Sequence, residues 1–126
     1  MSRASSGIYN VENVSLMRLY GNYLRQTTGI IDNYPVTSAF PSFLYLKATA
    51  ARDVLLPFVD STVDGMLLFI YNEGTGTITL KTSSDAAFTV ALAMTGVASP
   101  GGGNPMILQA VATGVQVTAW RRLSGS

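Results

Sequence analysis

The sequence predicts an all-β protein, a jelly-roll-like antiparallel β sandwich of about seven short strands preceded by an N-terminal arm. Short segments rich in strand-forming residues recur from residue 42 onward and are separated by turn residues. Regular spacing of this kind favours a sandwich or jelly roll over βαβ units. Charged residues make up 12% of the 126 residues, about half of the roughly 25% usual in soluble domains.

The predicted strands follow from local composition and alternation. The best of them is 66–72, an apolar run, and 76–82 alternates with Ile78 and Leu80 on one side. These two runs predict a hairpin in which Gly74 and Gly76 adopt positive φ, and Gly65 is predicted to reverse the chain before it. The other predicted strands are 43–49, 53–57, 87–93, 105–110 and 115–120, and the segment 99–105 (SPGGGNP) is predicted to be a loop.

The first 41 residues form a predicted arm, and residues 42–126 form the predicted sandwich domain. The arm is expected to be extended in part, although residues 10–24 also fit a short helix capped by Asn13. Its apolar side chains need a surface to cover them, which could be its own domain, a neighbouring subunit or a partner. We expect assembly contacts from Ile8, Tyr9, Leu16, Leu19, Tyr20 and Tyr23.

Composition argues against several classes of function. The chain has neither histidine nor cysteine, so the commonest general base, the commonest metal ligand and thiolate chemistry are missing. The net charge is +1 with no basic stripe, which argues against nucleic-acid binding. No apolar run is long enough for a membrane-spanning helix, and the first residues lack the apolar core of a secretory signal. We therefore expect no enzymatic activity, no catalytic residue, no cofactor and no metal.

Two features have competing interpretations. Asp60, Asp64 and Glu73 are interpreted as turn residues, with an acid–base pair or a calcium site as the sharper alternatives. Trp120, the single tryptophan, is interpreted as a core or interface anchor, with a sugar-stacking platform as its alternative.

Several stretches together resemble a known family. They are VLLP at 54–57, VDG at 63–65, FIYNEGTGTITL at 69–80 and WRRL at 120–123. This outline resembles the small β domains of tailed-bacteriophage virion proteins, which include capsid decoration (cement) proteins and head or tail fibres. The resemblance covers about residues 44–123 and implies no catalytic residue. The family often has a shorter glycine-rich turn where this chain has 96–105.

The resemblance, the low charge and the apolar arm predict a capsid decoration protein. Such a protein would be made in the host cytoplasm and bind the major capsid protein on the outer capsid surface of the virion. It would act as a homo-oligomer, a trimer in preference to a dimer, and stabilise the shell by bridging capsomers. The alternative is a fibre or receptor-binding module that recognises a host surface glycan.

Overall fold

The computed structural model describes residues 23–37, 43–96 and 105–125, and this part of the chain is almost entirely β structure. It contains nine strands and one short 3-10 helix, η1, and therefore confirms the all-β prediction. The elements are β1 (Tyr23–Arg25), β2 (Tyr34–Pro35), β3 (Phe43–Leu46), β4 (Arg52–Leu55), β5 (Leu67–Asn72), β6 (Ile78–Lys81), β7 (Ala93–Met94), β8 (Met106–Ala110), η1 (Gln116–Thr118) and β9 (Trp120–Ser124).

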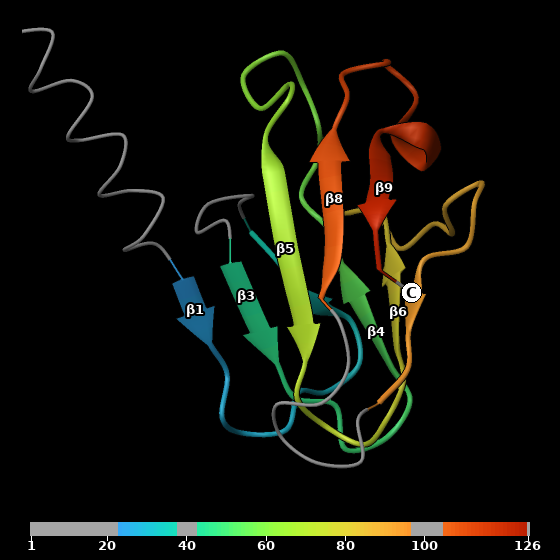
Figure 1. Cartoon of the computed structure of the whole chain (residues 1–126). Coiled ribbons are helices and arrows are strands. Elements are labelled where there is room, and N and C mark those ends of the chain that lie inside the picture. The colour runs from blue at the N-terminus through green and yellow to red at the C-terminus, as the bar shows by residue number, and fades with distance from the viewer. Residues whose placement is uncertain (1–22, 38–42, 97–104, 126) are drawn as a thin grey trace, which may run out of the picture.

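The strands form two sheets. The five-stranded sheet has the order β1-β3-β5-β8-β9, and the four-stranded sheet has the order β2-β4-β6-β7. In Figure 1 the five-stranded sheet lies in front, and β4 and β6 of the second sheet lie behind it. Their inward side chains form one apolar cluster that includes Leu46, Leu56, Leu68, Ile70 and Leu108.

The first six strands alternate between the two sheets. Each strand pairs in parallel with the next strand but one: Tyr23 lies beside Phe43, and Phe43 lies beside Phe69. The same winding places β2 beside β4 and β4 beside β6 in the second sheet. Each parallel pair is therefore joined through a strand of the opposite sheet, which supplies the long crossover that parallel pairing needs. The antiparallel pairings involve the later strands, β5–β8, β8–β9 and β6–β7.

This winding corrects two predictions. β5 and β6 are not a hairpin, because they belong to different sheets. The antiparallel arrangement is also wrong for β1 to β6, so the jelly-roll prediction is not confirmed. The physical reason is that an apolar run of period two shows which side chains are buried but does not show which strand lies next to it.

The connections between the sheets stack at one end of the structure, at the bottom of Figure 1. The segment 26–33 bonds to 47–51, since the Ile30 amide donates to the Lys47 carbonyl over 2.9 Å. The segment 73–77 lies on 47–51 in turn, and the Gly76 amide donates to the Ala48 carbonyl over 2.7 Å. We call these three segments the stacked arches.

Gly74 and Gly76 are required by this stacking. A Cβ atom at Gly74 would overlap the backbone of Ala48, and one at Gly76 would overlap the backbone of Ala50. Neither residue has the positive φ that the predicted hairpin turn demanded, whereas Gly65, with φ of 84°, reverses the chain as predicted. Close backbone approach, not turn conformation, therefore explains the two arch glycines.

Two predicted strands have different bounds. The segment predicted as strand 115–120 begins with η1, because the Thr118 amide and hydroxyl both donate to the Val115 carbonyl. Such local bonds compete with sheet pairing, and β9 begins only at Trp120. In the predicted strand 87–93, only an isolated bridge at Ala87 and the start of β7 are found.

The predicted boundary between residues 41 and 42 does not separate the described residues into two units. β1 and β2 precede this boundary but pair with β3 and β4. Ile30 and Val36, also before it, are buried members of the common core. Most of the predicted arm, 1–22, lies outside the described residues, and so does most of the predicted loop 99–105.

Candidate functional site

The outer face of the five-stranded sheet carries a continuous group of aromatic and apolar side chains. Alternation along each strand produces it, because Leu44, Leu68 and Ile70 point into the core while their neighbours point outward. Register then aligns these neighbours across the sheet in two rows. We call this group the aromatic face, and its members are Tyr23, Phe43, Tyr45, Phe69, Tyr71 and Ile107.

The rings of the aromatic face contact one another. Phe43 and Phe69 are stacked, with centroids 4.7 Å apart and planes 18° from parallel. Tyr45 meets Tyr71 at 5.9 Å in a tilted arrangement and meets Tyr23 edge-on at 6.1 Å. The rings therefore form a connected group with fixed relative positions.

One ion pair borders this group. The Arg25 guanidinium meets the Glu73 carboxylate in a bidentate pair, with Nε to Oε1 at 2.8 Å and Nη2 to Oε2 at 3.1 Å. The hydrogen bond and the charge of Glu73 raise the pKa of Arg25 above its ordinary value. Because each charge neutralises the other, the pair adds no net charge to the border of the aromatic face.

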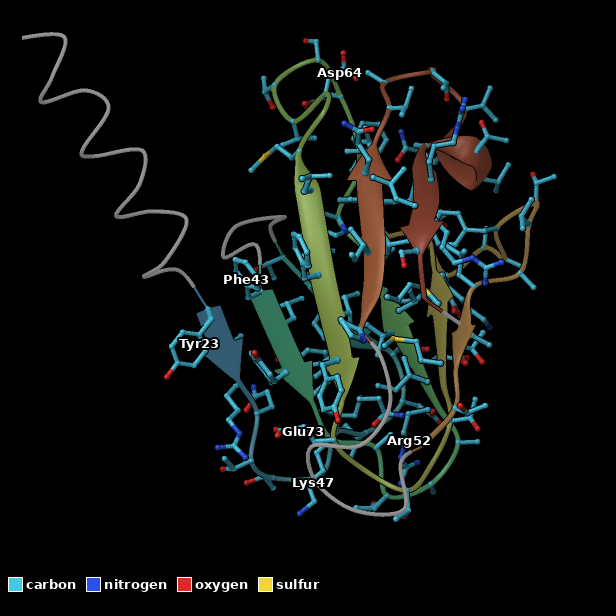
Figure 2. All side chains as sticks on the ribbon, in the orientation of Figure 1. Tyr23, Phe43, Lys47, Arg52, Asp64 and Glu73 are labelled. Carbon is cyan, nitrogen blue, oxygen red and sulfur yellow. The ribbon has the colours of Figure 1, made fainter. Side chains whose placement is uncertain are left out.

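A shallow hollow opens on the same face. Its volume is about 340 Å³, and its lining is mostly aromatic, with the Glu73 side chain on one side. Figure 2 shows Phe43 on β3 and Glu73 just beyond β5. The lining residues are Phe43, Leu44, Tyr45, Phe69, Tyr71, Glu73 and Pro105.

The outer face of the four-stranded sheet is different in character. Its outward positions carry Asp53, Leu55, Thr79 and Lys81. The Lys81 ammonium lies 3.0 Å from a carboxylate oxygen of Asp53 and 3.5 Å from one of Asp85. Charge is thus concentrated on one sheet, and aromatic surface on the other.

Of the six predicted assembly residues, Tyr23 alone lies in the described part of the chain. It belongs to β1, is 61% exposed and sits at the margin of the aromatic face, as Figure 2 shows. The other five, Ile8, Tyr9, Leu16, Leu19 and Tyr20, lie outside the described residues, so their contacts stay a prediction.

Sequence reasoning missed the other members of the aromatic face. The available signal was the alternation of large residues in FLYL (43–46) and LLFIYN (67–72), which puts aromatic side chains opposite buried aliphatic ones. That signal was not enough, because only the parallel pairing of β3 with β5 brings Phe43 to Phe69.

Trp120 is a core residue. It is 5% exposed, and its Nε1–H donates to the Pro57 carbonyl over 3.1 Å. The interpretation as a packed anchor is confirmed, and the alternative of a sugar-stacking platform is wrong because the ring is covered.

The carboxylates form no shared site within the described residues. Asp60 accepts hydrogen bonds from the Thr62 amide and hydroxyl, and Asp64 accepts one from the Ala112 amide. These bonds fit the interpretation as turn residues, and Glu73 is paired with Arg25. Across the described ranges, no cluster of three or more acidic residues could hold a metal ion.

The Thr62 hydroxyl bond lowers the pKa of Asp60 below its ordinary value. Because the folded-state pKa is depressed, this contribution to stability is present above the ordinary value and is lost as pH falls through the folded one. In Thr62→Val we expect the pKa of Asp60 to rise toward the ordinary value, as followed by NMR titration. Ser61→Ala, in the same turn, should leave it unchanged. An equal pKa in wild type and Thr62→Val would show that the hydroxyl bond is unimportant.

No helix in the described part of the chain has the length and apolar character needed to cross a membrane. Comparison with known proteins finds no matching family model, no matching curated protein and no matching solved structure.

Proposed function

We propose that this chain is a non-enzymatic virion structural protein, a capsid decoration (cement) protein that binds the outer capsid surface and acts as a homo-oligomer. The observation that carries the proposal is the aromatic face, an uncharged group of rings on one sheet of a chain whose other sheet bears the charges. Exposed apolar patches of this kind mark interaction surfaces. The low overall charge supports it further, because the centres of protein interfaces are depleted in charge.

The mechanism would be binding energy shared between subunits. Each bound copy buries apolar surface against capsomers, at about 25 cal/mol per Å² removed from water. A ligand that binds the assembled shell but not its separated subunits shifts the equilibrium toward the assembled shell. In this account the fold acts as a rigid carrier, and its rings supply contact area at low entropic cost, since each has only two rotatable side-chain bonds.

The alternative function is a fibre or receptor-binding module that recognises a host glycan. The hollow beside Tyr45, Tyr71 and Glu73 favours it, because hydroxyl and carboxylate groups there could bond to sugar hydroxyls. The stacking of Phe43 on Phe69 argues against it at the centre of the face. A sugar stacks on an open ring face, and here each ring turns one face toward the other ring.

The copy number of the chain in purified virus particles tests the proposal. Quantitative mass spectrometry should give a number comparable to that of the major capsid protein, because a cement protein covers the whole surface. A small fraction of that number would favour the fibre alternative, and a glycan array would then be the next measurement. Absence of the chain from washed particles would contradict both functions.

A further inference from the structure

The aromatic face lies open in the described structure, and its chemistry limits what can cover it. The Phe43 and Phe69 centroids are 4.7 Å apart, which matches the spacing of about 4.8 Å between neighbouring strands. Rings stacked at the strand spacing stand up from the sheet, cover one another's faces and turn edges outward. Ring edges fit between the side chains of another protein better than they support a flat sugar.

The charges of this face are compatible with an identical face. Its central residues carry no charge, and Arg25 and Glu73 at its border form a bidentate pair. Two copies can approach face to face without like-charge repulsion, and both lose the same apolar surface from water. The outer face of the four-stranded sheet, with Asp53 and Lys81, would have to remove charged groups from water to do the same.

The sheet edges offer weaker sites for self-association. β2 and β7 have two residues each, and β2 includes Pro35, which has no amide hydrogen to donate. β9 carries Arg121 and Arg122 and pairs irregularly with β8. β1 has three residues, enough for few main-chain bonds. An edge-to-edge contact would therefore have little to hold it.

We propose that a second copy of this chain packs on the aromatic face through its own aromatic face. The inference concerns the self-association within the proposed function and needs no capsid. A face that meets itself closes as a two-fold dimer, so this geometry favours the dimer over the trimer. The face spans four strands and covers roughly 300–400 Å² by strand spacing. A standard interface buries about 800 Å² per partner, so the dimer should be weak and depend on concentration.

Sedimentation velocity of the full chain over a wide concentration range tests this inference. Wild type should shift from monomer to dimer as concentration rises. Phe69→Ser, at the centre of the face, and Tyr23→Glu, at its exposed margin, should each weaken the dimer about tenfold or more. Phe58→Ser removes an aromatic side chain that is 58% exposed outside this face and should leave the dimer unchanged. Tyr23→Glu keeps the test valid if Phe69→Ser fails to fold.

Several results would overturn the inference. A wild-type chain that stays monomeric at every concentration would do so, and so would a dimer that neither face variant weakens. A trimer would contradict the face-to-face geometry. If the chain dimerised only after removal of residues 1–22, the occupant would be its own N-terminal segment. A monomeric chain that is still abundant in particles would sink this inference and leave the cement proposal standing.

Discussion

Replacing Gly74 with alanine is expected to destabilise the fold by about 3 kcal/mol, the upper part of the usual range for overpacking. A Cβ atom at this position would lie well inside 3.0 Å of backbone atoms of Ala48. The obstacle is backbone, and Ala48 is held there because its carbonyl accepts the Gly76 amide. The arches would have to separate, and the bonds between them would lengthen. Chemical denaturation of the purified chain measures this loss.

Gly114→Ala is the matched control for this prediction. Gly114 has φ of 78°, and a Cβ atom there would meet nothing within 4 Å. Its replacement should cost only about 1 kcal/mol, the penalty for a left-handed conformation. If the two variants lost equal stability, conformational strain would explain both, and close stacking of the arches would be wrong.

Replacing Asn72 with alanine is expected to cost about 3 kcal/mol, because it leaves buried backbone groups without partners. The side chain is 2% exposed and links two arches. Its Oδ1 accepts from the Gly74 amide at 3.0 Å and from the Ala48 amide at 3.4 Å, and its Nδ2 donates to the Gly76 carbonyl at 2.7 Å. Thr82→Ala, at a buried threonine whose hydroxyl accepts from the Ala86 amide, should cost about 1 kcal/mol.

Asn72→Asp adds a pH dependence that a cavity alone would not produce. The new carboxylate would face the Gly76 carbonyl in a buried site, so burial should raise its pKa above the ordinary value. A raised folded-state pKa means that stability is greatest below the unfolded value and falls as pH rises through the folded one. The deficit of Asn72→Asp relative to wild type should therefore shrink in acid. A deficit that is independent of pH would contradict the assigned hydrogen bonds.

Local patterns in the sequence predicted which residues are buried. Leu68 and Ile70 alternate with Phe69 and Tyr71, and this alternation is enough to identify β5 and its core side. The all-β class, the packed Trp120 and the positive φ of Gly65 could be predicted for the same reason. Each depends on neighbours close in the chain.

Pairing between distant segments could not be predicted. The partners of β3 lie 20 and 26 residues away on either side, and they are reached through strands of the other sheet. No local pattern encodes that distance, so two strands joined by a glycine-rich turn were predicted as a hairpin. The aromatic face depends on this pairing, which is why Tyr23 was predicted as a contact residue while Phe43 and Phe69 were not.

The most direct test of the account is whether the aromatic face becomes buried when the chain is assembled. Hydroxyl-radical footprinting, read residue by residue, would compare the dilute isolated chain with the chain on purified particles. The account predicts several-fold lower oxidation of Tyr23, Tyr45 and Tyr71 on particles, with Phe58 outside the face unchanged. Equal oxidation of the three tyrosines in both states would contradict a role for this face in assembly.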